Sequence, residues 1–310
     1  MPLISICIPA YKRVKYLQRL LDSIAVQTFR DFEVIVSDDS DDDSVKVLLQ
    51  AYNQKFTIQY YKNKPSLGTP ANWNFGIAKA TGEWIKLIHD DDWFATAESL
   101  QVFADNIQQQ HKLIFCAYAN RTGTTAGSIE EMRFPALWKN KIIKNPMTLL
   151  AYNVIGPPSV TLIHKSIKEK YDERMKWRVD MDFYVRLLLQ EKKYTYIDKI
   201  LVNVGISETQ VTNYCFQNPS VELPEGYLLL QKYGAQRLKN IWVYDAWWRL
   251  LRNMNIREEV QLAKYVKEQW PAVIIKMVKH LKAVPDKLLN VGIISKTVMT
   301  VSYLLNRPKI

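Results

Sequence analysis

The sequence predicts an α/β fold, in which a mostly parallel sheet is flanked by helices and followed by a helical C-terminal region. Short apolar runs alternate with helical segments over the first third of the chain, a pattern typical of βαβ units. The predicted strands are apolar on both faces, as in a sheet that helices cover on both sides. Beyond Pro224 the pattern is wholly helical.

Each element follows from its local pattern. Residues 3–8, 32–36, 57–61 and 84–88 are short, largely apolar runs, and we expect a strand at each. After the first run, four apolar side chains recur at helical spacing, namely Leu17, Leu20, Leu21 and Ile24. Further helices are expected at residues 44–52 and 70–80. Acidic residues gather at the carboxyl ends of the strands, where sheets of this class bind ligands.

The remainder of the chain falls into two parts. Residues 113–207 alternate short strands with loops, and Gly156, Pro157, Pro158 and Ser159 form a rigid turn among them. The helical pattern then runs to the C-terminus. We expect one domain at residues 1–223, with halves at 1–112 and 113–223, and a helical region at residues 224–310.

The net charge of +11 is concentrated near the C-terminus. Residues 231–310 hold 15 Lys and Arg against 5 Asp and Glu, whereas residues 1–230 hold 27 against 26. An apolar content of 48% excludes a disordered chain, and only three cysteines exclude a disulfide scaffold. The near-neutral body and the basic C-terminal quarter therefore need separate explanations.

Compartment signals favour the cytoplasm. Cys7, Cys116 and Cys215 are far apart and show no CxxC spacing, so neither a disulfide framework nor a zinc site is indicated. No basic residue precedes the N-terminal apolar run, which Pro9 ends, so we do not expect this run to be a signal peptide. The longest uncharged stretch, residues 145–163, holds three prolines and does not predict a spanning helix.

The most informative stretch is His89, Asp90, Asp91, Asp92 and Trp93 at the end of the fourth strand. Three adjacent carboxylates repel one another unless a cation neutralises them, and Mg²⁺ or Mn²⁺ prefers oxygen ligands of this kind. Mg²⁺ is commonly held by one or two carboxylates together with substrate phosphates. A solvated acidic loop or a helix N-cap explains the same residues equally well.

Two further strand ends carry polar or aromatic residues. Asp38 and Asp39 follow the second strand, where an Asp can accept hydrogen bonds from a base or ribose or can cap the next helix. Tyr11 follows the first strand, where its ring can lie against a nucleobase or can simply pack. The residues themselves leave both pairs of alternatives open.

Several segments in order resemble the family 2 glycosyltransferases of the GT-A fold, which include bacterial enzymes of cell-surface polysaccharide synthesis. They are IPAYKR, QTFRDFEVIVSDDS and NKPSLGTPANWNFGIAKATGEWIKLIHDDDWF, which together cover residues 3–100 densely. GPPSVTLIHKS and VDMDFYVRLL continue the resemblance, and the second of these is similar to the acceptor-side motif of the family.

The resemblance implies roles for particular residues. The metal, Mn²⁺ or Mg²⁺, would be held by Asp92 with help from Asp90. Asp180 matches the catalytic base, and Asp182 is the next candidate for that role. The nucleotide-sugar site would comprise Pro9, Ala10, Tyr11, Arg13, Asp39, Asn72 and Asp91, with Asp39 on the base and Asp91 on the ribose.

The implied reaction is an inverting transfer of a sugar from a nucleotide diphosphate, UDP by family analogy, to a hydroxyl of a glycan or lipid-linked oligosaccharide. The acceptor hydroxyl must lose a proton as it attacks, which a carboxylate can accept. One departure concerns the metal motif. Family members often have Leu-Asp-Ser-Asp-Asp where this chain has Ile88, His89, Asp90, Asp91 and Asp92, which shifts the carboxylate register.

The basic C-terminal region has two explanations. Ile274, Met277, Val278 and Leu281 lie on one helical face with lysines between them, and residues 288–305 form a second amphipathic stretch. Segments of this kind can lie on the anionic inner face of the cytoplasmic membrane. They can also pack on the core with their lysines in water, and the aromatic residues at 242–251 favour packing there. For residues 271–310 we expect membrane association.

Rival functions are disfavoured by missing motifs. A nucleic-acid-binding protein would use the basic, Trp-rich segment, but no known module is recognisable and the acidic strand ends repel phosphates. A nucleotidyltransferase would need a Gly-rich first loop, and IPAYKR has no Gly. Neither GxGxxG nor GxxxxGK[ST] occurs, which argues against a dehydrogenase or P-loop kinase.

Overall fold

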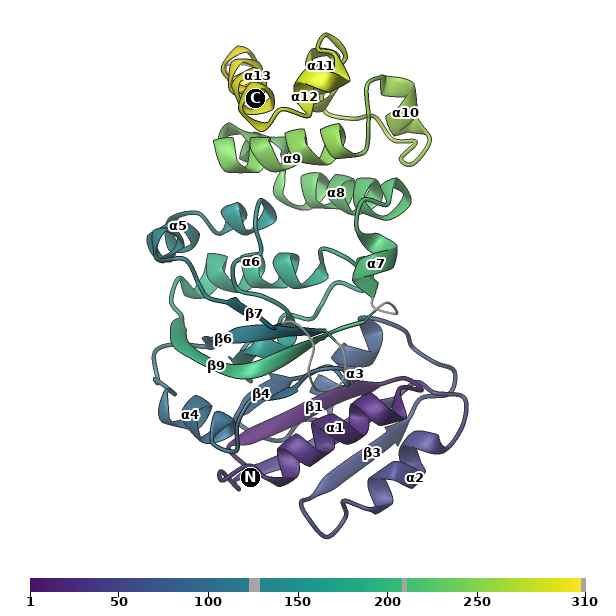
Figure 1. Cartoon of the computed structure of the whole chain (residues 1–310), viewed down its shortest axis with the longest axis vertical. Coiled ribbons are helices and arrows are strands. Elements are labelled where there is room, and N and C mark those ends of the chain that lie inside the picture. The colour runs from purple at the N-terminus through teal and green to yellow at the C-terminus, as the bar shows by residue number, and fades with distance from the viewer. Residues whose placement is uncertain (123–128, 208–210, 308–310) are drawn as a thin grey trace. The chain divides into compact units, whose positions relative to one another are not determined.

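The computed structural model describes residues 1–122, 129–207 and 211–307. Its strands, drawn as arrows in Figure 1, form one sheet. The strand order is β3-β2-β1-β4-β8-β6-β9-β5, and β7 pairs with β6. The strands are β1 (Ile4–Ala10), β2 (Phe32–Asp38), β3 (Ile58–Lys62), β4 (Trp84–Leu87), β5 (Trp93–Phe94), β6 (Leu113–Thr122), β7 (Ile129–Met132), β8 (Thr161–His164) and β9 (Thr195–Ile206).

The N-terminal part of the sheet is parallel. β3, β2, β1 and β4 run side by side in one direction, and β6 and β9 also pair in parallel. β8, β7 and β5 join antiparallel. The predicted fold class, a sheet flanked by helices with a helical C-terminal region, is confirmed, although the sheet is mixed beyond β4.

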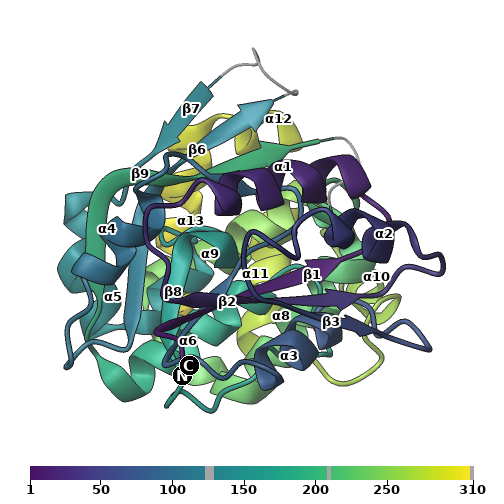
Figure 2. The same ribbon diagram turned by 90° about the horizontal axis from the view of Figure 1, so that it is seen from below.

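Helices cover both faces of the parallel strands. α1 (Val14–Ala25) and α2 (Ser44–Gln50) lie on one face, and α3 (Ala71–Ala78) lies on the other (Figure 2). Leu17, Leu20, Leu21 and Ile24 of α1 are fully buried, as their spacing predicts. Because β2 is buried along its whole length, both of its faces are covered.

Residues 113–207 are more regular than the sequence indicates. Besides the short strands β7 and β8, they contain two long strands, β6 and β9, which pair with each other across a wide sequence separation. The segment also contains α5 (Lys139–Lys144) and α6 (Val179–Glu191). Long-range strand pairing of this kind leaves no local signal, which explains the difference.

Helical structure also begins earlier than expected. α7 (Val211–Cys215) and α8 (Pro219–Tyr233) precede or span Pro224, which lies inside α8. Asn218 caps α8 by accepting a hydrogen bond from the Ser220 N–H, and Pro219 occupies the first helical position, where a missing N–H costs nothing.

The described residues divide into two compact units. The first takes the described residues within 1–144, 154–173 and 183–210. It holds the sheet with α1, α2, α3, α4 (Ser99–Asp105) and α5. The second comprises residues 145–153, 174–182 and 211–310. Its helices include α9 (Ile241–Asn253), α10 (Glu259–Ala263), α11 (Ala272–Lys282), α12 (Asp286–Leu289) and α13 (Gly292–Asn306).

The apolar face of α11 is buried inside the second unit. Val273, Ile274, Met277, Val278 and Leu281 are all buried, and α11 packs against α9 and α13. The expectation that this face meets a membrane is therefore wrong for α11. Among the described residues, no helix is both long and apolar enough to cross a bilayer.

Candidate active site

The candidate site lies at the carboxyl ends of three adjacent parallel strands. β1 pairs with β2 on one side and β4 on the other, with Pro9 opposite Ser37 and Ala10 opposite Asp38. The segments that follow these strands are residues 11–13, 39–43 and 88–92. The topology therefore brings three separate sequence motifs to one edge of the sheet, as ligand sites in such sheets require.

Arg13 neutralises two of the carboxylates after β4. Its guanidinium forms an ion pair with Asp90, and its NH1 donates to Asp91 Oδ2 at 2.8 Å. Asp90 is only 2% exposed, and burial raises its pKa to about 7 although Arg13 opposes the shift. The Asp90 carboxylate is therefore held by the chain's own cation.

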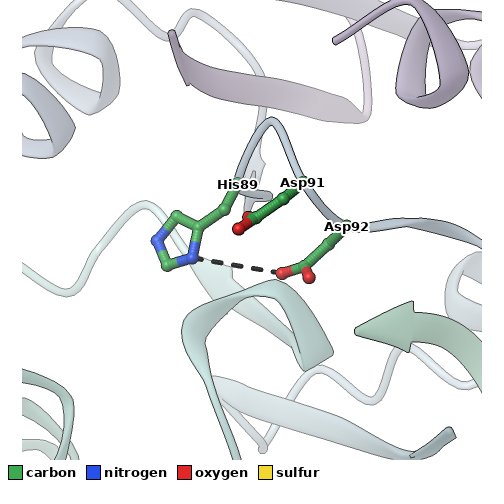
Figure 3. Close-up of side chains that lie close together, drawn as sticks. All are labelled: His89, Asp91 and Asp92. Carbon is green, nitrogen blue, oxygen red and sulfur yellow. Dashed lines mark ion pairs between the residues drawn. The ribbon is translucent and has the colours of Figure 1, made fainter. Parts of the chain in front are cut away.

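The side chains of His89, Asp91 and Asp92 converge (Figure 3). One ligand atom from each lies within 4.8 Å of the others, and His89 Nδ1 is 4.0 Å from Asp92 Oδ2. Burial raises the pKa of Asp92 to about 8 and lowers the pKa of His89 to about 4. A neutral imidazole beside two buried carboxylates is a donor set suited to a divalent cation.

His89 Nε2 is buried and has no hydrogen-bond partner in the described part of the chain. The imidazole also packs on Trp73, with the ring centroids 4.7 Å apart. A buried polar atom without a partner is costly unless a ligand completes its environment. Packing on Trp73 therefore leaves one ring nitrogen of His89 without a hydrogen bond among the described residues.

Three residues that support this loop were not singled out from the sequence. The Gly205 N–H donates to Asp92 Oδ1 at 3.0 Å, and the Ser159 hydroxyl accepts from the His89 N–H at 3.0 Å. Arg19 NH2 donates to the Asp91 carbonyl at 2.7 Å. Only the rigid turn that contains Ser159 carried a sequence signal, because contacts across β4, β8 and β9 depend on the folded sheet.

Asp39 and Asn72 belong to one buried hydrogen-bond network that includes Asn63. Asp39 accepts hydrogen bonds from Asn63 Nδ2 at 2.8 Å, from the Leu67 N–H at 3.1 Å and from the Gly68 N–H at 2.8 Å. Asn63 also donates to Asn72 Oδ1 at 3.1 Å. Because a carboxylate accepts about four hydrogen bonds, Asp39 keeps little capacity for a ligand.

The remaining nucleotide candidates lie in and after β1. Pro9 and Ala10 are the last two residues of β1, and Ala10 is buried. The Tyr11 side chain is 53% exposed at the strand end, so a flat ligand can reach its ring.

The two candidate bases belong to the second unit and differ from each other. Asp180 is partly exposed, accepts from Asn153 Nδ2 at 2.7 Å, and has its pKa raised by burial to about 7. Asp182 is fully buried and accepts from Lys232 Nζ and the Tyr233 hydroxyl, each at 2.8 Å. Asp182 therefore links the first turn of α6 to α8 within the second unit.

The segment before Asp180 borders a cavity inside the second unit. The cavity has a volume of about 170 Å³, and Trp177, Arg178, Phe216 and Arg249 are among its lining residues. The rings of Trp177 and Phe216 lie 6.3 Å apart. Aromatic surface combined with a few fixed polar groups is typical of pockets for small ligands.

A known protein family and several relatives match this chain. The family model "Glycosyl transferase family 2" matches residues 5–169. Uncharacterized glycosyltransferases of Rickettsia typhi and Methanocaldococcus jannaschii are 24% and 26% identical. The first match covers 68% of this chain and 66% of the relative, and the second covers 66% and 71%. The chain thus spans about two thirds of the length of these relatives.

Solved structures share the fold at low identity. S. aureus TarS 1–349 in complex with UDP-GlcNAc has a TM-score of 0.60 and 16% identity, over 98% of this chain and 90% of that one. The mannosyltransferase PcManGT from Pyrobaculum calidifontis, in complex with GDP-Man and Mn²⁺, has a TM-score of 0.57 and 10% identity, over 99% and 87%. With more than half of its residues matched by the family model, the chain belongs to the family 2 glycosyltransferases and has their GT-A fold.

Proposed function

We propose that the protein transfers a sugar from a nucleotide-diphosphate donor, a UDP-sugar, to a hydroxyl of a glycan or lipid-linked oligosaccharide, with inversion. The observation that carries this proposal is the convergence of His89, Asp91 and Asp92 at the ligand-binding edge of the sheet. Its family supports sugar transfer, and the UDP-GlcNAc complex of TarS supports the donor class.

Relatives support the acceptor class. A Campylobacter jejuni relative is a GalNAc(5)-diNAcBac-PP-undecaprenol beta-1,3-glucosyltransferase, 36% identical over 30% of this chain and 30% of its own length. The abequosyltransferase RfbV of Salmonella typhimurium is 32% identical over 37% of this chain and 35% of its own length. We infer a role in cell-surface polysaccharide synthesis, such as O-antigen or capsule.

The residues at the strand edge fit Mn²⁺ or Mg²⁺. We assign the ion to Asp91 and Asp92 with His89, because their ligand atoms converge. We assign Asp90 to Arg13, because Asp90 accepts from two nitrogen atoms of the guanidinium group, whereas Asp91 accepts from one. An imidazole ligand favours Mn²⁺ over Mg²⁺, which prefers oxygen. A bound ion of this kind stabilises the negative charge of a departing nucleotide diphosphate.

The chain's own residues bind the donor and accept the proton. Tyr11 offers a ring at the end of β1, and Asp39 with Asn72 fixes the loop at residues 67–68 next to β2. Asp180 is the proposed base, because a partly exposed carboxylate with its pKa raised to about 7 can take a proton near neutral pH. The cavity lined by Trp177 and Phe216 is the proposed acceptor site.

Mn²⁺ binding and donor hydrolysis test the assignment together. We expect titration calorimetry to detect Mn²⁺ binding to the wild type, and Asp92→Asn and His89→Ala each to weaken it at least about tenfold. Asp90→Asn is the matched control, since it removes the charge next to Arg13 and should change Mn²⁺ affinity less. Both ligand variants should also lose UDP release from UDP-sugars.

The proposal fails if a panel of nucleotide sugars yields no nucleotide with any acceptor and Mn²⁺ does not bind. If Asp90→Asn abolishes Mn²⁺ binding and His89→Ala leaves it intact, the metal ligand is Asp90 and not His89. For location, we propose the cytoplasm at the inner face of a membrane, because a lipid-linked acceptor has its sugar at a membrane surface.

A further inference from the structure

The last long helix of the second unit, α13, buries three polar side chains beside Met299 and Tyr303. Its buried residues include Ser295, Ser302 and Asn306. Ser302 Oγ lies 2.6 Å from the Tyr244 hydroxyl and 2.7 Å from His280 Nδ1, and Asn306 Nδ2 donates to the Tyr244 hydroxyl at 2.7 Å. This network fixes which face of α13 points toward α9 and α11.

Ser295 orients the other end of the helix in the same way. Its hydroxyl accepts from Trp248 Nε1 at 3.2 Å and from Arg252 NH1 at 2.9 Å. Because buried hydroxyl and amide groups need hydrogen-bond partners, a rotation of α13 would leave several of them unpaired. The orientation of α13 is therefore determined along its whole length.

The outward face of α13 is apolar as a consequence. Ile293 is 82% exposed, Val301 52%, Leu304 58% and Leu305 60%. A helix of a water-soluble protein normally has the reverse arrangement, with its apolar stripe toward the core. A contiguous apolar surface of this kind marks a contact with another apolar phase or molecule.

The two hydroxyls on the same face are already satisfied. Thr297 Oγ1 donates to the Ile293 carbonyl at 3.0 Å, and Thr300 Oγ1 donates to the Lys296 carbonyl at 2.9 Å. Such bonds back to the helix leave no donor that requires water. The face can therefore enter a low-dielectric medium without exposing an unpaired hydroxyl to it.

Positive charges border this apolar face. Lys296 and Arg307 are exposed, and at about 100° per residue they fall along one edge of the apolar face. Lys287, just before α13, is also exposed. Residues 231–310 carry 15 Lys and Arg against 5 Asp and Glu, although Lys309 lies outside the described residues.

We propose that the exposed face of α13 is a membrane-binding surface, on which the helix lies in the interface of an anionic phospholipid bilayer. α13 has 15 residues, about 22 Å, and is too short to cross a hydrocarbon core of about 30 Å. The observations match an interfacial helix, which combines an apolar face with flanking Lys and Arg. This inference deepens the proposed location and does not depend on the catalytic assignment.

Charge favours a bilayer over a second copy of the chain on this face. Two copies would bring together two strongly basic regions, which repel each other. Anionic headgroups instead supply the opposite charge, and each Lys or Arg near the surface strengthens binding about fivefold.

The test uses the full chain with a single probe. The native cysteines are all buried, so Val301→Cys provides the reactive thiol for a polarity-sensitive fluorophore. We expect its emission to shift to the blue with vesicles of phosphatidylcholine and phosphatidylglycerol in equal parts, and less with phosphatidylcholine alone. Val47→Cys in α2 is the matched control, because Val47 is 61% exposed.

Paired variants separate the two contributions in vesicle sedimentation. Leu304→Gln with Leu305→Gln should weaken binding at least about tenfold. Lys296→Gln with Arg307→Gln should weaken it roughly 25-fold at low salt. Two control pairs change exposed residues outside α13 and should leave vesicle binding unchanged. The apolar control is Leu137→Gln with Val47→Gln, and the charge control is Lys46→Gln with Lys199→Gln. Melting temperatures verify that each variant is folded.

Absence of binding to phosphatidylglycerol vesicles at low salt overturns the proposal, as does binding that the α13 variants leave unchanged. A lipid-free dimer in analytical ultracentrifugation that Leu304→Gln with Leu305→Gln dissociates would assign the face to a second copy. Sugar transfer to a soluble acceptor is measured in parallel. Because that assay needs no membrane, failure of the catalytic proposal is distinguishable from failure of this one.

Discussion

Four neighbouring side chains in one loop have different environments. Asp90 and Asp91 both pair with Arg13, and Asp91 also lies beside His89 and Asp92. All three carboxylates are nearly inaccessible to water, which makes uncompensated charge costly. The loop therefore combines Asp90, which Arg13 holds through two nitrogen atoms, with Asp91 and Asp92, which lie beside the His89 imidazole and suit an external cation.

Asp180 provides a pH-dependent prediction. A base must be deprotonated, so we expect kcat to rise with pH and to level off above about 7, where Asp180 titrates. Asp180→Asn should lower kcat by roughly 10²- to 10⁴-fold and abolish this limb of the pH profile. If the rise of kcat with pH persists in Asp180→Asn, the titrating group is not Asp180.

The stability of the folded protein should fall with rising pH, whereas kcat rises. Burial raises the pKa of Asp180 from 3.8 to about 7, so the folded state binds the proton more tightly than the unfolded chain does. Asp180 therefore contributes a decrease in stability as pH rises from about 4 to about 7. Thermal melts should show Asp180→Asn gaining stability relative to the wild type across this range.

Individual elements position the loop through close backbone contacts. β9 approaches the acidic loop at Gly205, where a Cβ would lie 2.3 Å from the Asp91 carbonyl oxygen. α8 contributes Glu225, which is buried and accepts from the N–H groups of Lys176 at 2.6 Å and Arg178 at 2.8 Å. Each contact fixes a segment next to a proposed functional residue.

Gly205→Ala should damage the metal loop. The new methyl group meets a backbone oxygen that cannot move alone, so we expect a loss of about 1–3 kcal/mol of stability and weaker Mn²⁺ binding. Gly76→Ala in α3 is the control, because its Cβ would lie at an ordinary 3.5 Å from Ser37. That variant should gain about 0.5–1 kcal/mol. Equal melting temperatures for the two variants would contradict the packing argument.

Glu225→Ala should loosen the segment that leads to Asp180. Losing the carboxylate leaves adjacent N–H groups without acceptors, at a cost of about 1–3 kcal/mol in urea unfolding. Glu225→Gln keeps one oxygen and should recover part of this loss. Glu259→Ala is an exposed control on α10 and should be neutral. Wild-type stability of Glu225→Ala would remove Glu225 from this role.

At the scale of the whole molecule, the chain passes repeatedly between the two units. The second unit takes short segments from the middle of the sequence, residues 145–153 and 174–182, and joins them to the C-terminal helices. Inside the second unit, the helices lie in successive layers, from α8 through α9 to α11 and α13 (Figure 1). Asp180 therefore depends on helices that follow it by many residues.

A chain that ends at residue 223 should not fold independently. This boundary, predicted from sequence, lies within α8, and truncation there removes Glu225, Lys232 and Tyr233. Asp182 would keep a buried charge without its Lys232 partner, which is strongly destabilising. We expect no cooperative melt by circular dichroism, whereas a chain ending at residue 307 should melt like the full chain. A cooperative, donor-binding fragment 1–223 would show that the first 223 residues suffice.

The sequence by itself determined the α/β class, the strands and helices of the first hundred residues, and the family, because these depend on local periodicity and on motifs at strand ends. Only the tertiary structure decided which carboxylates pair with Arg13, how Gly205 and Ser159 support the loop, and that α11 buries its apolar face while α13 exposes one. Both helices have apolar faces in sequence. What separates them is the buried network of Ser295, Ser302 and Asn306, whose hydrogen bonds form only between helices that are already packed.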